Sequence, residues 1–292
     1  MAQSCSNGIW DPERITALLA RCGRYALERW REEDWRLKSD GSLVTDVDEA
    51  LERELTAELE CVADGIHVIG EETVACQDEA YISQAMAGRA YVVDPIDGTA
   101  PFAHGIGYWG TSIGLMEGGR LTHGGIVLPA QKELFVTDGD RVLWTDCLDL
   151  ASGEPAELRV LEPCFTPCEA GRMVGLGQRF VRTAPFPWPN PTLVTGCAIQ
   201  GLAYLMLGRL SAYVGYMKLW DLAAVLPMLL RCGVEVRLVD GTPVTASVVS
   251  EVFDLVAGSP TRWALQDECV FGPPSAFQSL YPVVCARLRG ER

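Results

Sequence analysis

The sequence predicts a mixed α/β fold built in two halves. Near the N-terminus, apolar residues recur at helical spacing, and short apolar strands bounded by turn residues follow them. In the second half, predicted strands and helices alternate, which is typical of a layered arrangement with some parallel strand pairing. We therefore expect an α+β half over residues 1–150 and an α/β half over residues 151–292.

Two helices are expected at the start of the first half. The first spans residues 11–35: Asp11 can cap it, and Pro12 suits its first position. A polar stretch with a turn, LKSDGSLVTDVD, leads to a second helix at about residues 46–62. One face of this second helix is apolar and carries Leu51, Leu55 and Leu59.

A mainly antiparallel sheet is predicted after these helices. IHVIG and RAYVVD are short apolar strands. YWGTSIGLMEGGRLTHGGIVLP predicts a hairpin that turns at Gly118–Gly119, and KELFVTDGDRVLW predicts another that turns at Asp138–Gly139. A proline-rich, irregular segment at about residues 146–170 then separates the two halves.

The second half contains four predicted strands and two predicted helices. The strands are RMVGLG, PTLVTG, LSAYVGY and VEVRLVD. The helices are CAIQGLAYLMLG and DLAAVLPMLLRCG, the latter ending at Gly233.

The bulk composition excludes several classes of protein. The formal net charge is −15 over 292 residues, which argues against nucleic acid as a partner, because such a binder needs a basic face. No apolar run approaches the ~20 residues that span a bilayer. The first residues lack the basic and apolar segments of a secretion signal. The 11 cysteines are scattered and odd in number, which is typical of reduced thiols, so we expect a cytoplasmic location.

The segment VVDPIDGT indicates a metal and phosphate site. It places Asp94 at a strand end and Asp97 three residues later, and Gly98 permits a tight turn. Thr99 is expected to cap a helix that begins near Pro101. Carboxylates bind hard divalent cations, and a helix start offers N–H groups to phosphate. The simplest alternative is a capped turn with a solvated aspartate. Phosphatases that use a D-x-D-x-T nucleophile do not fit, because their aspartates are two residues apart.

Three further segments supply polar groups. VIGEE places Glu71 and Glu72 just past a strand end, and KLWDLAA places Asp221 at a helix start. KSDGSLVTDVD supplies the group Lys38, Asp40, Thr45, Asp46 and Asp48. Taken alone, Asp221 is an ordinary helix cap and KSDGSLVTDVD an ordinary exposed loop.

Together and in this order, the four segments resemble the inositol monophosphatase-like family of metal-dependent phosphatases. The resemblance covers most of the chain and implies a layered αβαβα sandwich. It also implies metal ligands: Glu71, Asp94 and the carbonyl of Ile96 for one ion, and Asp94, Asp97 and Asp221 for a second. Mg²⁺ is the expected cofactor, with two or three ions bound, and Mn²⁺ is an expected substitute.

A mechanism follows from the resemblance as a hypothesis. A metal-activated water attacks phosphorus in line, with Glu71 beside the metal. Thr99 orients the water, Asp48 positions Thr99, and Thr45 holds Asp48 in place. The remaining expected phosphate or substrate contacts are Gly98, Lys38 and Asp221.

The residues expected to contact the substrate depart from the family pattern. Pro101 replaces a usual asparagine, YVGYMKLWD lacks a usual glutamate, and Cys197 replaces a small hydroxyl residue. We expect a small polyol or sugar phosphate resembling inositol 1-phosphate. Histidinol phosphate and 3′-phosphoadenosine 5′-phosphate are alternatives, because similar loops occur in those branches. Tyr108 and Trp109 are either ring-stacking residues or sheet-packing residues. An inactive metal- or phosphate-binding protein is the remote alternative, and a homodimer is expected by analogy.

Overall fold

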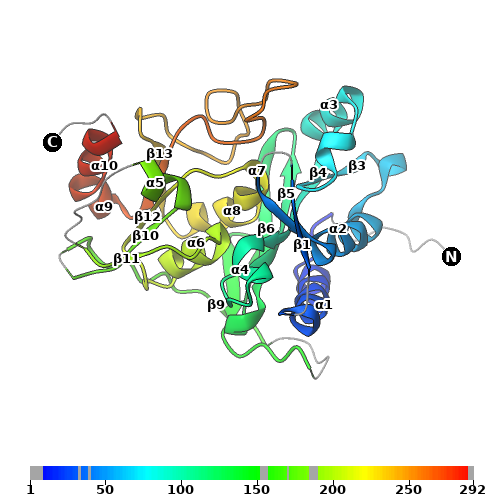
Figure 1. Ribbon diagram of the computed structural model, residues 1–292, viewed down its shortest axis with the longest axis horizontal. Helices are drawn as coiled ribbons and strands as arrows, with labels where there is room; N and C mark the ends of the chain where they lie inside the picture. The colour runs from blue at the N-terminus through cyan, green and yellow to red at the C-terminus, as the bar shows by residue number, and fades with distance from the viewer. Residues whose placement is uncertain are drawn as a thin grey trace.

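Two β-sheets alternate with three layers of helices (Figure 1). The computed structural model describes residues 9–31, 34–38, 41–151, 157–169, 171–183 and 190–288. Asp40 lies outside these residues. The architecture is the layered αβαβα sandwich expected from the sequence.

The helices follow one another along the chain as α1 (Pro12–Arg29), α2 (Asp46–Leu59), α3 (Glu79–Ala87), α4 (Thr99–Ala103), α5 (Gln178–Thr183), α6 (Ala198–Met206), α7 (Leu219–Ala223), α8 (Val225–Arg231), α9 (Pro274–Ser279) and α10 (Tyr281–Leu288). Short 3-10 turns lie at η1 (Val62–Asp64), η2 (Val74–Cys76) and η3 (Pro129–Gln131).

The large sheet has the strand order β3-β4-β5-β6-β7-β8-β9. Its β3–β4 pair is parallel and its other pairs are antiparallel. The strands are β3 (Ile66–Gly70), β4 (Arg89–Asp97), β5 (Gly110–Glu117), β6 (Arg120–Leu128), β7 (Glu133–Asp138), β8 (Arg141–Thr145) and β9 (Arg159–Val160). Both predicted hairpins are confirmed.

The small sheet has the order β11-β10-β12-β14-β13. Strand β10 pairs in parallel with β11 and β12, and β14 pairs antiparallel with β12 and β13. The strands are β10 (Val174–Leu176), β11 (Thr192–Leu193), β12 (Ala212–Gly215), β13 (Glu235–Leu238) and β14 (Cys269–Gly272). A separate hairpin joins β1 (Trp35–Leu37) to β2 (Leu43–Thr45).

Strand β4 shows how the layers are encoded. Tyr91 and Val93 pack in the core with α1 and α2, whereas Ala90 and Val92 pack in the core with α6, α7 and α8. Because the strand is buried on both faces, residues 90–93 are continuously apolar instead of alternating. Side chains two residues apart share a face, so Asp94 follows Val92 toward the middle layer of helices.

A pair of facing glycines lets the middle layer approach the large sheet closely. Gly114 of β5 pairs with Gly124 of β6. A Cβ atom on Gly124 would lie 1.8 Å from the carbonyl oxygen of Ala224, and one on Gly114 would lie 2.5 Å from the carbonyl carbon of Ala223. Only glycine fits here, and the close contact positions α7, whose third residue is Asp221.

Some predicted elements differ from those observed. The first helix ends at Arg29, well before residue 35, because Trp30 has an extended ψ and Arg31 has a positive φ. The polar stretch after it contributes β1 and β2. The predicted helix DLAAVLPMLLRCG is split at Ala224 into α7 and α8. Strand β14 and helices α3, α9 and α10 were not predicted from the sequence.

The division at residue 150 stays a prediction. Strand β9 lies beyond that position and completes the large sheet. The largest buried apolar cluster joins residues of both sheets through α6, α7 and α8. Among the described residues, no helix is long and apolar enough to cross a membrane.

The glycine pair generates a stability prediction. Gly124→Ala should lower the free energy of unfolding by about 2–3 kcal/mol, because the added methyl group overlaps the backbone of Ala224 and forces α7 away from the sheet. Urea unfolding measures the change. Gly118→Ala is the control: that turn residue has open space around it and a φ of 56°, so only about 1 kcal/mol of backbone strain is expected. Equal losses in the two variants would contradict the close-packing explanation.

Candidate active site

A β-bulge in β4 turns two aspartates toward the same side. Asp94 pairs with Ser112 and Asp97 pairs with Gly110, so β4 advances three residues where β5 advances two. In a regular strand, residues three apart point to opposite faces, and the extra residue cancels that alternation. The hydroxyl of Thr111 donates to the carbonyl of Pro95 within the bulge at 2.8 Å.

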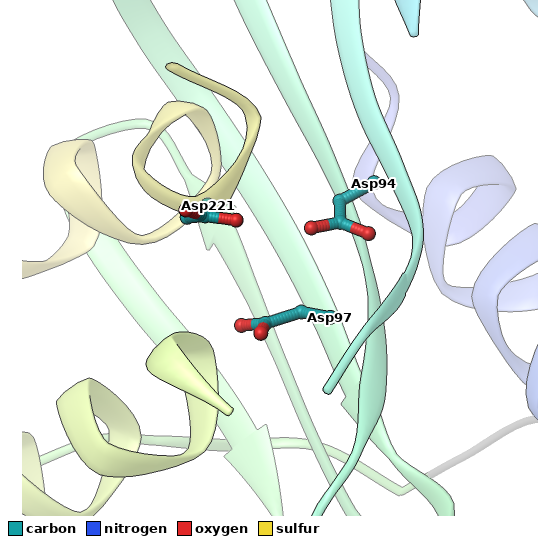
Figure 2. Close-up of side chains that lie close together, drawn as sticks. All are labelled: Asp94, Asp97 and Asp221. Atoms are coloured by element: carbon teal, nitrogen blue, oxygen red, sulfur yellow. The ribbon is translucent and has the colours of Figure 1, made fainter. Parts of the chain in front are cut away.

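Asp221 completes a cluster of three carboxylates, drawn together in Figure 2. One oxygen from each of Asp94, Asp97 and Asp221 lies within 4.8 Å of the others. The Asp221 carboxylate accepts the backbone N–H of Lys218 at 2.7 Å, which fixes it at the start of α7. Segments far apart in the sequence therefore converge on one point.

The other two aspartates differ in their hydrogen bonding. Asp97 accepts the backbone N–H groups of Ala198 at 3.1 Å and Ile199 at 2.6 Å, at the start of α6. Asp94 is 1% exposed, and neither of its oxygens has a hydrogen-bond partner among the described residues. Burying an ionised carboxylate without a partner is costly. A divalent cation is the partner that this all-oxygen set fits best.

Burial and mutual repulsion raise the pKa values of these groups. Burial raises the pKa of Asp97 to about 6, and burial together with the charge of Asp97 raises that of Asp221 to about 8. The pKa of Asp94 is raised well above its usual range by burial and by its carboxylate neighbours, Glu71 first among them. Each shift records how unfavourable the negative charges are without a cation.

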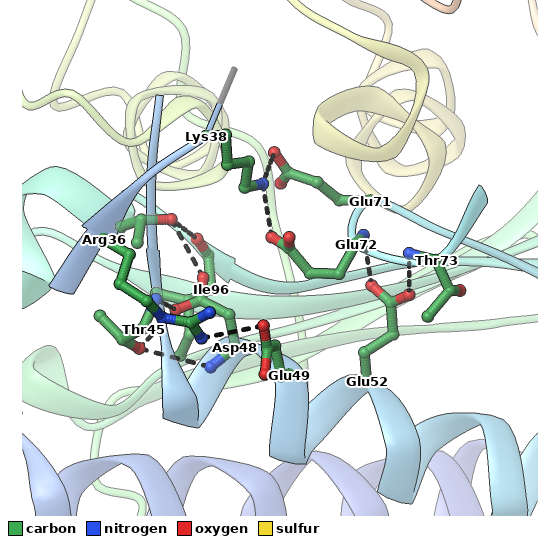
Figure 3. A network of polar contacts seen from close by, with 11 residues as sticks. Arg36, Lys38, Thr45, Asp48, Glu49, Glu52, Glu71, Glu72, Thr73 and Ile96 are labelled. Atoms are coloured by element: carbon green, nitrogen blue, oxygen red, sulfur yellow. Dashed lines mark hydrogen bonds and ion pairs between the residues drawn. The ribbon is translucent and has the colours of Figure 1, made fainter. Parts of the chain in front are cut away.

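Glu71 lines the same cavity but contacts a lysine (Figure 3). The Nζ atom of Lys38 lies 3.1 Å from Glu71 Oε1 and 2.6 Å from Glu72 Oε1. Although burial lowers the pKa of Lys38, the two glutamates raise it above its usual value overall. Burial and the charge of Glu71 raise the pKa of Glu72 to about 7.

Glu52 supports this loop, a role that was not predicted from the sequence. Its fully buried carboxylate accepts the backbone N–H groups of Glu72 and Thr73, each at 2.8 Å (Figure 3). A Cβ atom on Gly70 would lie 2.3 Å from the carboxyl carbon of Glu52, so the strand end also depends on glycine. A signal was present: Glu52 lies four residues after Asp48, on the same helix face.

Thr45, Asp48 and Thr99 form a hydrogen-bonded chain in which Thr45 and Asp48 are buried and Thr99 is half-buried. Thr45 donates to Asp48 Oδ2 through its backbone N–H at 2.9 Å and its hydroxyl at 2.5 Å. Thr99 Oγ1 lies 3.1 Å from both Asp48 Oδ1 and the carbonyl oxygen of Ile96. Burial raises the pKa of Asp48 to about 6, and the hydrogen bonds from Thr45 and Thr99 to its carboxylate oppose part of that rise.

The expected cap of α4 is wrong. Gly98 is the N-cap, with a φ of 92°, and Thr99 is the first helical residue. No side chain caps this helix, because the Thr99 hydroxyl is turned to Asp48 and Ile96. A Cβ atom on Gly98 would lie 2.5 Å from the carbonyl oxygen of Tyr108, which adds a steric reason for glycine.

A cavity of about 600 Å³ opens over the carboxylates. Its walls are formed by residues from both halves of the chain: Gly41, Ser42, Leu43, Glu71, Asp94, Ile96, Asp97, Gly98, Thr99, Ala100, Gly177, Gln178, Arg179, Arg182, Gly196, Cys197, Ala198, Tyr213, Tyr216, Met217 and Asp221. Arg179, Arg182, Tyr213 and Tyr216 were not predicted from the sequence to belong to the site.

Tyr108 and Trp109 do not line this cavity. Trp109 is fully buried and packs edge-on against Phe102, with ring centroids 4.9 Å apart. The sheet-packing alternative is therefore the correct one for Trp109. Among the described residues, the aromatic rings that line the cavity belong to Tyr213 and Tyr216.

Comparisons with known proteins place the chain in a family. A model of the inositol monophosphatase family matches residues 13–269. An inositol-1-monophosphatase from Mesorhizobium japonicum is 30% identical over 210 residues, covering 70% of this chain and 75% of that protein. A histidinol-phosphatase from Mycobacterium tuberculosis is 26% identical over 235 residues, covering 77% and 86%. A crystal structure of an IMPase/NADP phosphatase with Mg²⁺ and phosphate has a TM-score of 0.67 and 15% identity, covering 92% of this chain and 93% of that one.

The fold and the acid-lined cavity define a class, the metal-dependent phosphatases. The chain belongs to the inositol monophosphatase family, as its sequence motifs predict.

Replacing Glu52 tests the support of the loop. Glu52→Ala should lower the free energy of unfolding by about 2 kcal/mol, because two backbone N–H groups lose their acceptor. It should also weaken Mg²⁺ binding, since the loop carries Glu71. Urea unfolding and calorimetric Mg²⁺ titration measure the two effects. Glu49→Ala on the same helix removes only an exposed ion pair with Arg36 and should cost less than about 0.5 kcal/mol. Matching losses would contradict the role of Glu52.

The raised pKa values predict how metal-free stability depends on pH. In the unfolded chain, aspartates lose their protons near pH ~4. In the folded protein, the pKa of Asp97 is raised to about 6 and that of Asp221 to about 8, so both keep their protons to higher pH. Their contribution to stability is therefore present below pH ~4 and is lost as pH rises through the folded-state pKa values. In EDTA, the melting temperature should fall from pH 5 to pH 8.5, and Mg²⁺ should restore it. Scanning fluorimetry measures both effects.

Two variants separate the cluster from other titrating groups. Asp94→Asn should flatten the pH dependence in EDTA and remove the Mg²⁺-induced rise. Asp46→Asn, whose side chain is 81% exposed, should leave both unchanged. Metal-free stability that increases over the same pH interval would overturn the interpretation.

Proposed function

We propose that this protein is a Mg²⁺-dependent phosphomonoesterase acting on a small phosphorylated metabolite. The observation that carries the proposal is the Asp94 carboxylate, which is buried, lacks a hydrogen-bond partner among the described residues, and converges with Asp97 and Asp221 beside a cavity of about 600 Å³. The family of the chain supports the same activity.

The proposed metal ligands come from the three acidic segments of the sequence. Glu71, Asp94 and the carbonyl of Ile96 would hold one ion, and Asp94, Asp97 and Asp221 a second. Bound Mg²⁺ would neutralise phosphate charge and make water more acidic. The related crystal structure that contains Mg²⁺ and phosphate supports this choice of cofactor. A third ion near Glu71 and replacement by Mn²⁺ are parts of the same proposal.

Thr99 and Asp48 are proposed to orient the attacking water. Asp48 accepts hydrogen bonds from Thr45, which hold its carboxylate in place. When the Thr99 hydroxyl donates its hydrogen to Asp48, the lone pairs of its oxygen face away and can accept a hydrogen from water. In-line phosphoryl transfer requires mainly this positioning and charge neutralisation.

The phosphate contacts are proposed from the local backbone and nearby charges. The backbone N–H groups of Gly98 and Thr99 lie at the start of α4, beside the cluster. Lys38 is paired with Glu71 and Glu72. A cation bound by Glu71 would compete for the same carboxylate, which would leave the ammonium of Lys38 for phosphate. Asp221 is the proposed contact for the leaving group.

The substrate candidates are an inositol 1-phosphate-like ester, histidinol phosphate and 3′-phosphoadenosine 5′-phosphate. The names of the relatives include both an inositol-1-monophosphatase and a histidinol-phosphatase. A homodimer in the cytoplasm is proposed by analogy with the family.

Phosphate release tests the proposal. The panel contains inositol 1-phosphate, histidinol phosphate, 3′-phosphoadenosine 5′-phosphate, fructose 1,6-bisphosphate and glycerol 2-phosphate, each with Mg²⁺ or with EDTA. We expect Mg²⁺-dependent turnover that Asp94→Asn abolishes. Thr99→Ala should lower kcat by about 10²-fold or more with little change in KM, because water orientation acts mainly in the transition state.

Thr99→Ser is the matched control, since it keeps the hydroxyl and should retain most of the activity. Mg²⁺ binding without turnover of any ester would favour the inactive binding protein. Turnover that persists in EDTA would contradict the metal-dependent mechanism.

A further inference from the structure

A second cavity of about 480 Å³ lies apart from the acid-lined one. It is formed by the start of β6, the turn between β7 and β8, and the end of α8, which packs against β6 (Figure 1). In the large sheet, Glu117 of β5 pairs with Arg120 at the start of β6 and with Arg89 at the start of β4, whereas Asp94 lies near the other end of β4. The two cavities therefore lie at opposite ends of these strands, and the described residues that line one do not line the other.

A β-bulge shapes the second cavity, as another bulge shapes the acid cluster. While β5 advances one residue, from Leu115 to Met116, β6 advances two, and Thr122 is the residue left without a partner in the ladder. Its carbonyl oxygen accepts a hydrogen bond from Nη2 of Arg231 at 2.8 Å, which links the bulge to α8. Bulges are common beside functional sites, because they turn backbone and side-chain groups out of the regular pattern.

Arg231 is held in a fixed orientation at the end of α8. Besides the bond to Thr122, its Nε–H donates to the carbonyl of Gly139 at 3.0 Å and its Nη1 donates to the carbonyl of Pro227 at 3.0 Å. A guanidinium has five N–H donors, so the three backbone acceptors leave two donors for a ligand. Carbonyl oxygens orient the group but do not neutralise its charge.

The cavity carries more positive than negative charge. In the described part of the chain, Arg231 forms no ion pair with a carboxylate. Burial lowers the pKa of its guanidinium, and the charge of Asp140, the acid among the described lining residues, opposes part of that effect. Arg120 adds a second guanidinium, which is exposed. Because a partly buried charge is costly without an opposite charge, two guanidinium groups against one carboxylate favour an anionic ligand.

The arrangement of the two arginines favours phosphate among anions. Arg120 lies at a strand start and Arg231 at a helix end, so the two side chains reach a ligand from different directions. The terminal oxygens of a phosphate monoester also point in different directions, whereas a carboxylate offers two oxygens in one plane. Much of the remaining wall is apolar, and the volume lies within the usual range for small-molecule sites. The apolar lining residues are Leu121, Pro227, Leu230 and Ala246.

We infer that this second cavity binds a small organic phosphate, whose phosphate group contacts Arg120 and Arg231 and whose apolar body packs against the wall formed by α8. The inference does not depend on the proposed phosphatase function, because the site uses none of the residues assigned to the reaction. The simplest alternative is that Arg231 only fastens the β7–β8 turn to α8.

Calorimetry on the metal-free protein tests the site. The titrations are done in EDTA, so that no metal ion is present to bind phosphate in the acid-lined cavity. The probes are phenyl phosphate, inorganic phosphate, benzoate and phenol. We expect phenyl phosphate to bind at one site per chain, and each of the other probes to bind about tenfold more weakly or less, because each lacks the phosphate group or the apolar body.

Variants of the lining residues test which groups bind the probe. Arg120→Ala removes an exposed side chain, so it should raise the Kd of phenyl phosphate about tenfold and leave urea unfolding unchanged. Arg231→Lys keeps the charge but loses the fixed guanidinium, and should also raise the Kd. Asp140→Asn removes the opposing charge and should lower the Kd by about threefold. Arg53→Ala is the charge-matched control: Arg53 is exposed on α2 and lines neither cavity, so the Kd should not change.

Three outcomes would overturn the inference. Absence of any phenyl phosphate binding would leave Arg231 with the structural role alone. Binding that survives both Arg120→Ala and Arg231→Lys would show that the probe binds elsewhere. Benzoate that binds as tightly as phenyl phosphate would contradict the choice of phosphate.

Discussion

The repulsion among three carboxylates, two of them buried and that of Asp221 half-buried, is the constraint on which the site depends. Asp94, Asp97 and Asp221 lie within a few ångströms of one another, and Asp94 has no hydrogen-bond donor among the described residues. Such a cluster costs folding free energy, which a divalent cation can offset. The surrounding structure therefore has to hold the carboxylates together before any ion arrives, and backbone features do most of this.

Three local devices hold the cluster in place. The bulge in β4 puts Asp94 and Asp97 on one face, the start of α6 donates two N–H groups to Asp97, and the pair Gly114–Gly124 admits α7 close enough to deliver Asp221. Glu52 plays the equivalent role for the loop of Glu71. Each device uses backbone atoms or buried side chains, which move less than exposed ones, so the ligands are preorganised.

The two halves of the chain contribute differently to the cavity. The first half brings Glu71, Asp94, Asp97 and the Thr45–Asp48–Thr99 chain, which a phosphoryl transfer needs whatever the leaving group. The second half brings Asp221 together with Arg179, Arg182, Tyr213 and Tyr216. Substrate preference is therefore expected to depend mainly on the second half, whereas the chemistry needs both halves, because Asp221 belongs to the carboxylate cluster.

The sequence by itself determined the layered α/β class, both hairpins, and the acids at strand and helix ends. Those features depend on local periodicity, turn residues and short motifs, which act over a few residues. It did not reveal that Arg31 ends the first helix early, that Glu52 carries the loop of Glu71, or that α5 places arginines at the cavity. Only the tertiary structure decided these, because they depend on contacts between segments that are distant along the chain and on which face of an element is buried.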